Sequence, residues 1–180
     1  MPRAGSARRY AQAVFQIAVE SDELDVWLED LSLLVRALES DELSRFLDAA
    51  EASAAQKTEV IRTTLSQSVG PLAVNLLALL SSRNLTHLVS DVADRYELLL
   101  DAHRGIERAE VVSAVPLDDE QRQRVEELLK VVVGKDVRMT ERVDPAVIGG
   151  LVARVGDRVI DGSTRTKLSA MRRDLVDRRS

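Results

Sequence analysis

Hydrophobic residues recur at helical spacing through the first 105 residues of the chain. Apolar positions three and four residues apart form one face of an amphipathic helix, so this pattern predicts six helices. Their apolar stripes, and the breaks between them, place the helices at residues 7–20, 24–38, 41–47, 53–65, 72–83 and 85–104. Helices of these lengths with short connections are typical of an all-α bundle.

Several of these helices have residues at their ends that favour a start or a stop. Ser53 and Gln56 have the spacing of a capping box, in which each side chain bonds a free backbone N–H group of the other. Pro71 suits the first turn of a helix, where its missing N–H group is not needed. Asn84 and Gly105 end the last two helices, because glycine in particular reaches the left-handed conformation of a helix C-terminus.

A different pattern follows the last of these helices. Residues 108–115 are rich in valine and predict a strand, and apolar and polar residues alternate over residues 137–143, as in a half-buried strand. A helix capped by Asp118 or Asp119 lies between them. Its predicted apolar stripe consists of Val125, Leu128, Leu129 and Val132.

The stretch from Ile148 to Leu168 completes the second half of the chain. Residues 151–155 alternate like a strand, Gly156-Asp157 is a hairpin-turn dipeptide, and residues 158–160 are the returning strand. These short elements predict a β-hairpin.

A final helix is predicted after a break that begins at Asp161, and Ser163 or Thr164 can cap its first turn. The predicted fold class is therefore mostly α. An N-terminal six-helix bundle, residues 1–105, is followed by a small α+β domain of order β-α-β-β-β-α, residues 106–180.

Composition limits the core and the chemistry of this chain. Hydrophobic residues make up 45% of the 180 residues but aromatic residues only 3%, so Leu, Val, Ile and Ala must build the core. The absence of cysteine excludes disulfides and thiolate metal sites, and two histidines, His87 and His103, argue against a multi-histidine centre. No apolar run approaches the roughly 20 residues that cross a bilayer, and the N-terminus lacks the apolar segment of a signal peptide. We expect a mature, soluble, cytoplasmic chain without a cofactor or a metal.

Charge differs between the two halves. The net charge is −5, and residues 1–105 carry 10 Lys and Arg against 16 Asp and Glu, whereas residues 106–180 carry 15 against 14. This balance argues against nucleic acid as the main partner. The basic cluster at the end of the chain is interrupted by Asp174 and Asp177 and has no interleaved aromatic residues for base stacking. We expect the two halves to hold different partners.

Asp157 and Asp161 are the candidates for an acid pair or for metal ligands. Paired carboxylates become catalytic only with a pocket and a third group. Each of these residues stands beside a glycine, and turn geometry accounts for both. No Ser-His-Asp or Cys-His arrangement is apparent, so the sequence favours structural roles for the two aspartates.

The first helix and the segment 72–80 have more apolar circumference than a small bundle needs for its own core. Either both are central helices, or a groove between them accepts the amphipathic helix of a partner. The pattern alone leaves both interpretations open.

The chain resembles the delta subunits of bacterial F-type ATP synthases, the counterparts of the mitochondrial oligomycin-sensitivity-conferring protein. The resemblance begins at ARRYAQAVFQIAVE, continues through the helix that contains Trp27 and through NLLALLSSRNLTHL, and is strongest at GGLVARVGDRVIDGSTRTKL. In that last segment the glycine pair, the GD turn and the DGS break occur at the spacing of the family. The match covers nearly the whole chain.

The resemblance implies a non-catalytic stator subunit of the peripheral stalk, which keeps the catalytic head from rotating during proton-driven ATP synthesis. The N-terminal bundle would bind the N-terminal helix of an alpha subunit between its first and fifth helices. The C-terminal domain would bind the C-terminal helices of the b subunits through its hairpin and last helix. Carried onto this sequence, the groove residues are Tyr10, Ala11, Val14, Ile17, Ala18, Asn75, Leu76, Leu79 and Leu80.

The resemblance also implies a peripheral location at the cytoplasmic face of the bacterial plasma membrane, with membrane attachment only through the complex. Two other functions remain as alternatives. One is a helical interaction or regulatory module unrelated to the synthase, and the other is a small hydrolase that uses Asp157 and Asp161.

Overall fold

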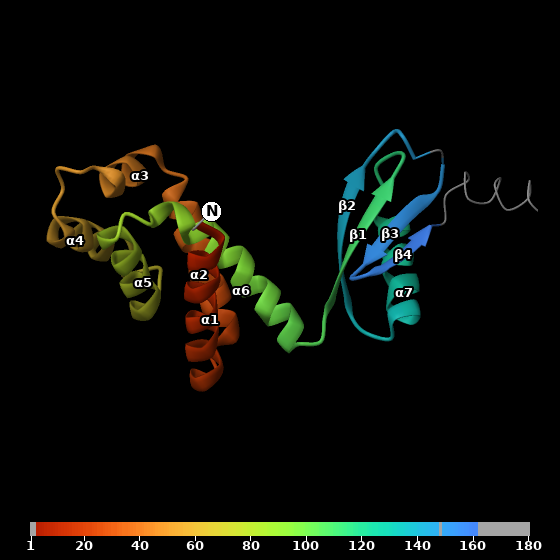
Figure 1. The fold of residues 1–180 in the computed structure, drawn as a ribbon, viewed down its shortest axis with the longest axis horizontal. Helices are drawn as coiled ribbons and strands as arrows, with labels where there is room; N and C mark the ends of the chain where they lie inside the picture. The colour runs from red at the N-terminus through yellow and green to blue at the C-terminus, as the bar shows by residue number, and fades with distance from the viewer. Residues whose placement is uncertain (1–2, 148, 162–180) are drawn as a thin grey trace, which may run out of the picture. The chain divides into compact units, whose positions relative to one another are not determined.

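The computed structural model describes residues 3–147 and 149–161 of the chain (Figure 1). The chain divides into two compact units, Met1–Leu100 and Asp101–Ser180. Helices make up the first unit, and a small sheet with one helix makes up the described part of the second (Figure 1). The predicted fold class, mostly α with a small α+β part at the C-terminus, is confirmed.

The division between the units falls inside a helix, α6 (Val89–His103), and not after it. Asp101 in the last turn of α6 forms ion pairs with Arg108 and Arg138, at 2.6 and 3.0 Å, so its contacts lie with the second unit. The predicted domains, residues 1–105 and 106–180, differ from the two units by this last helical turn.

The helices of the first unit follow the predicted order. Their bounds are α1 (Arg3–Ser21), α2 (Leu24–Leu38), α3 (Asp41–Asp48), α4 (Ala54–Leu65), α5 (Pro71–Ser82), the 3₁₀ helix η1 (Thr86–Leu88) and α6.

The first unit differs from prediction at η1. A continuous helix was expected over residues 85–104, but the chain makes a 3₁₀ turn before α6 begins at Val89. The hydroxyl of Thr86 in this turn donates a hydrogen bond to the carboxylate of Asp48 at the end of α3. Because the two residues are 38 positions apart, the helical periodicity of residues 85–104 carries no sign of this contact.

The predicted helix ends are confirmed. Ser53 and Gln56 form the capping box, with Gln56 N donating to Ser53 Oγ and Ser53 N donating to Gln56 Oε1. Pro71 occupies the first turn of α5. Asn84 and Gly105 have φ of +56° and +70°, the left-handed conformation with which a helix commonly ends.

One apolar cluster holds the first unit together. α1 contributes Ala7, Ala11 and Ala18, which are fully buried and small enough to let neighbouring helices approach closely. Most of the larger side chains of the cluster come from the other helices, and an edge-to-face contact at 5.7 Å joins the ring of Phe15 in α1 to that of Tyr96 in α6. The largest fully buried side chains are Tyr96, Leu31, Leu34, Leu47, Ile61, Leu77, Leu80 and Leu100.

The second unit is a four-stranded mixed sheet with order β2-β1-β3-β4. Strands β1 and β2 are parallel and α7 connects them, whereas β3 is antiparallel to both β1 and β4. Gly156, with φ of +55°, makes the tight turn between β3 and β4. The bounds are β1 (Glu107–Ser113), α7 (Asp119–Val133), β2 (Val137–Val143), β3 (Leu151–Val155) and β4 (Arg158–Asp161).

This order matches the predicted β-α-β-β-β, although Asp161 belongs to β4 and does not begin a break. The predicted final helix, with its caps at Ser163 or Thr164, lies outside the described residues. Asp118 is the residue that caps α7, through a capping box with Gln121.

Helix α7 lies on one face of the sheet (Figure 1). Val125 and Leu129 of α7 are buried against Val111 and Ala153 of the sheet. The prediction that Leu128 and Val132 share this buried stripe is wrong, because 65% of Leu128 and 54% of Val132 are exposed. The core of this unit is small, and α7 fills it with the i, i+4 pair Val125 and Leu129, with Val133 one turn further on packed at its edge. The three exposed apolar residues Leu128, Val131 and Val132 lie outside the core.

Candidate functional site

The predicted groove residues come from α1 and α5, which meet at one polar contact. Nη1 of Arg83, directly after α5, donates a hydrogen bond to the hydroxyl of Tyr10 in α1, at 3.3 Å. Tyr10 lies in α1 directly before Ala11, which with Val14 and Ala18 belongs to the buried face of this helix. The C-terminal end of α5 therefore lies beside the first half of α1.

Five of the nine predicted groove residues are buried in the core of the first unit. They stabilise the bundle by packing inside it, because their side chains belong to the same apolar cluster as those of α2 and α6. These five are Ala11, Val14, Ala18, Leu76 and Leu80.

The other four predicted residues reach the surface. Ile17 and Leu79 are exposed over 41% and 42% of their surface, Asn75 is also exposed, and Tyr10 is half-buried. A partner that covers the exposed parts of this isoleucine and leucine would be bound more tightly, because burial of a whole side chain of this kind stabilises a complex by about 1.5–3 kcal/mol.

Leu72 belongs to the same face of α5 but was not among the predicted residues. Half of its surface is exposed, and it lies three and seven positions before Asn75 and Leu79. That i, i+3, i+7 spacing marks one helix face, so the spacing could have identified Leu72. We call the exposed side chains of Ile17, Leu72, Asn75 and Leu79, together with half-buried Tyr10, the α1/α5 surface.

The second unit carries exposed apolar residues of its own. On α7 these are Leu128, Val131 and Val132, whose i, i+3, i+4 spacing places them on one face, and Val131 is 82% exposed. In the hairpin, Val159 of β4 is 56% exposed. The hairpin is one of the two elements predicted to bind b subunits, and the other, the last helix, lies outside the described residues.

The residues that the sequence offered for catalysis lie in both units of the chain. Asp157 is exposed in the turn between β3 and β4. His87 lies in η1 of the first unit, and His103 ends α6 in the second. Among residues 3–147 and 149–161, no group of three or more His, Cys, Asp and Glu side chains is placed to hold a metal ion.

None of the helices in the described residues combines the length and the apolar character needed to cross a bilayer.

Comparison with known proteins gives a consistent result over the whole chain. The family model of the ATP synthase delta (OSCP) subunit matches residues 7–175. The ATP synthase subunit delta of Desulforamulus reducens is 32% identical over 181 residues, with 100% of each chain covered. That of an Anaeromyxobacter species is 37% identical over 171 residues, 94% of this chain and 96% of the relative.

Among solved structures, a chain of the cryo-EM structure of the Toxoplasma gondii mitochondrial ATP synthase hexamer is similar. The TM-score is 0.62 and the identity 25%, with 94% of this chain and 97% of that chain covered. Sequence and fold therefore point to the same group of proteins.

Proposed function

This chain belongs to the ATP synthase delta (OSCP) subunit family, and we propose that it is a non-catalytic stator subunit joining the catalytic head of an F-type ATP synthase to the b subunits of the peripheral stalk. The observation that carries the proposal is the family match over residues 7–175, which spans both units. No active site of its own is needed for this function.

A stator must transmit torque without turning. If the head were free to rotate with the rotor, proton flow would produce no ATP. The task requires two separate attachments that dissociate slowly, and a chain with two compact units offers one unit for each. Apolar burial suits such joints, since it contributes about 25 cal/mol per Å² before the costs of association.

In this proposal the α1/α5 surface binds the N-terminal helix of an alpha subunit. An amphipathic helix recognises such a surface through apolar side chains spaced three and four residues apart. Ile17, Leu72 and Leu79 are the side chains that the partner covers, and Tyr10 and Asn75 supply polar groups beside them. The buried residues Ala11, Val14, Ala18, Leu76 and Leu80 form the packed layer beneath.

The second unit binds the C-terminal helices of the b subunits in the same proposal. Its support is the set of exposed apolar side chains on the hairpin and on α7, which the small core of this unit leaves uncovered. Through these contacts the chain is held at the cytoplasmic face of the plasma membrane as a peripheral protein, with the complex as its only link to the membrane.

The alpha-subunit contact is tested with a peptide that copies the alpha N-terminus and the full-length chain. Ile17→Asp and Leu79→Asp should each weaken binding by roughly 10- to 100-fold, since each places a charge where an apolar side chain is covered. Leu98→Asp on α6, where the leucine is 47% exposed, is the matched control and should bind like the unchanged chain. Isothermal calorimetry measures the affinities of the three variants and of the unchanged chain.

Exposed positions are required for this test. Val14 and Leu76 are 3% and 9% exposed, so an aspartate at either would disrupt the bundle itself. If the unchanged chain shows no binding of the peptide at micromolar concentration, or if Leu98→Asp weakens binding as much as Ile17→Asp does, the proposed surface is wrong.

Co-purification tests the stator function as a whole. The chain should copurify from membranes in mild detergent with alpha and b subunits. Purification without either would instead support a helical module unrelated to the synthase, which the family match disfavours. A hydrolase using Asp157 and Asp161 would show a turnover that Asp157→Asn with Asp161→Asn abolishes.

A further inference from the structure

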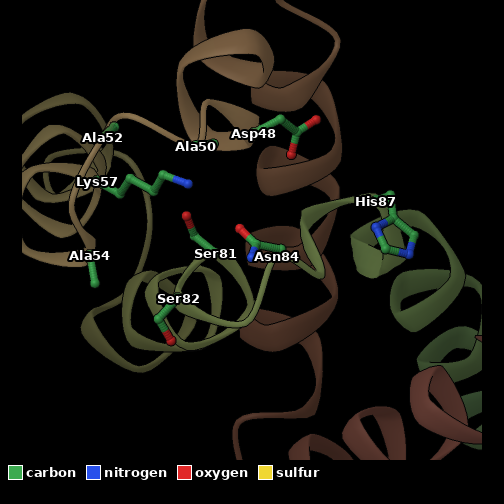
Figure 2. A pocket seen from close by; sticks show the side chains of 9 residues that line it. All are labelled: Asp48, Ala50, Ala52, Ala54, Lys57, Ser81, Ser82, Asn84 and His87. Carbon is green, nitrogen blue, oxygen red and sulfur yellow. The ribbon is translucent and has the colours of Figure 1, made fainter.

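A cavity of 560 Å³ opens in the first unit between the ends of several helices (Figure 2). It lies between the end of α3, the start of α4, the end of α5 and η1. Three alanines form part of its wall, and the polar lining residues are Asp48, Lys57, Ser81, Ser82, Asn84 and His87. The volume falls within the range of about 300–1,000 Å³ that is typical of small-molecule sites.

Lys57 is an unusual residue in this wall. It begins the buried stripe of α4, where Ile61 and Leu65 follow at intervals of four residues, and only 4% of its surface is exposed. Lysine is almost never buried to this extent unless it is paired. Within the described residues its ammonium group forms no ion pair and no hydrogen bond, and it is not among the fully buried atoms without a partner, so its nitrogen faces the open cavity.

Ser81 provides a second polar group without a partner. The residue is 1% exposed, and its Oγ has no hydrogen-bond partner among the described residues. Figure 2 shows the amine of Lys57 and the hydroxyl of Ser81 directed toward the same part of the cavity, with the carboxamide of Asn84 nearby. A buried donor without an acceptor costs about 1–3 kcal/mol. The Ser81 hydroxyl therefore favours an occupant that can hydrogen-bond to it, and the Lys57 ammonium group faces the same space.

Water is the simplest occupant, and the cavity is large enough to hold several molecules. Water alone leaves unexplained why a cation takes the first position of an otherwise apolar stripe. The capped N-terminus of α4, where Ala54 lines the cavity beside Lys57, adds the partial positive charge of a helix start. An anionic group beside Lys57 would meet both positive charges.

The negative charge of Asp48 limits which anions the cavity can bind. Its carboxylate also lines the cavity, and it accepts a hydrogen bond from Thr86. A fixed negative charge in the wall repels a second negative charge, and this repulsion is greater for phosphate, with a charge of about −1.5 to −2 at pH 7, than for a carboxylate. The lining therefore matches a singly charged ligand.

We propose that this cavity binds a small carboxylate, with its oxygens on the ammonium group of Lys57 and on the polar groups of Ser81 and Asn84. Nothing in the stator function requires such a site, so the proposal stands apart from it. The ligand is held by few groups, and we expect dissociation constants in the millimolar range.

The test is an NMR titration of the full-length chain with potassium acetate, with potassium chloride keeping the ionic strength constant and potassium phosphate in a parallel series. Acetate should shift the amide signals of Ser81 and Asn84 and the side-chain signal of Lys57, all with one saturable midpoint. Lys57→Met keeps the apolar stem of the side chain and removes the charge, and it should weaken binding by about tenfold or more. Lys135→Met in the second unit removes the same charge elsewhere and should leave the midpoint unchanged.

Three results would overturn the proposal. Shifts that rise linearly with acetate show that no site exists, and a midpoint unchanged in Lys57→Met shows that binding is elsewhere. A lower midpoint for phosphate than for acetate shows that the class of ligand is wrong. The side-chain signal of Lys57 in the unchanged chain decides the question even if Lys57→Met folds poorly, because it must move with the same midpoint as Ser81.

Discussion

The two units of this chain are stabilised by different means. All of the aromatic residues lie in the first unit, where Trp27 and Tyr96 are buried among leucines and alanines in one large cluster. The second unit contains no aromatic residue, and its core consists of a few valines, alanines and one leucine. Packing is therefore expected to contribute most of the stability of the first unit and less of that of the second.

Ion pairs surround the small core of the second unit. Asp101 pairs with Arg108 and Arg138, and Lys135 pairs with Glu107 across the start of β1, at 2.7 Å. Such pairs are individually weak at an exposed surface, but here several lie along the same two strands. The comparison teaches that a change in the apolar core should affect mainly the first unit, whereas a change in charge or pH should affect mainly the second.

The largest expected effect is on the core of the first unit. Leu77→Ala removes a fully buried side chain and leaves a cavity, so it should lower the free energy of unfolding by about 2–5 kcal/mol. Trp27 is the only tryptophan, and its fluorescence during urea unfolding reports on the first unit alone. Leu128→Ala, at a leucine that is 65% exposed in the second unit, is the control and should leave the Trp27 transition in place. A transition that Leu77→Ala does not move would contradict the role given to packing.

An intermediate effect is expected at Asp101 in the second unit. Its carboxylate is 3% exposed, accepts a hydrogen bond from Nε of Arg108 and forms an ion pair with Arg138, and both arginines are more than a third exposed. Asp101→Ala should lower the stability of β1 and β2 by about 1–3 kcal/mol, less than for a fully buried pair because solvent screens the arginines. Amide hydrogen exchange of the two strands measures the change. Asp136→Ala, at an exposed carboxylate 3.7 Å from Lys130, is the control and should have little effect.

Local signals in the sequence predicted most of the fold. The capping box of Ser53 and Gln56 and the helix stops at Asn84 and Gly105 depend on neighbours within a few positions, so the sequence contains the whole interaction. The 3₁₀ turn at Thr86 depends on Asp48, far away in the chain, and could not be predicted in this way.

The candidate surface was predicted less completely, for a related reason. Periodicity shows which residues of a helix share a face, but not whether that face is covered by the same chain or by a partner. Ala11 and Leu80 turned out to be core residues, whereas Ile17 and Leu79 on the same helices are exposed. On α7 the same ambiguity placed Leu128 in the core, although Val125 and Leu129 are the α7 residues that are buried against the sheet.

The smallest expected effect is a pH dependence confined to the second unit. The backbone N–H of Leu117 donates to the carboxylate of Glu141 at 2.7 Å, and this bond, with help from the guanidinium of Arg122, holds the pKa of Glu141 below its ordinary value of 4.5. Because the pKa is lower in the folded state, the charged carboxylate stabilises the second unit above pH 4.5, and this contribution is lost as pH falls toward the folded pKa. Hydrogen exchange of β2 between about pH 5 and pH 3 should therefore show a fall in stability that is smaller in Glu141→Gln. Glu127→Gln on the exposed face of α7 makes the same change in charge. This variant should show the same fall in the stability of β2 as the unchanged chain. An equal fall in both variants would mean that the Leu117–Glu141 bond contributes nothing to the acid sensitivity of this unit.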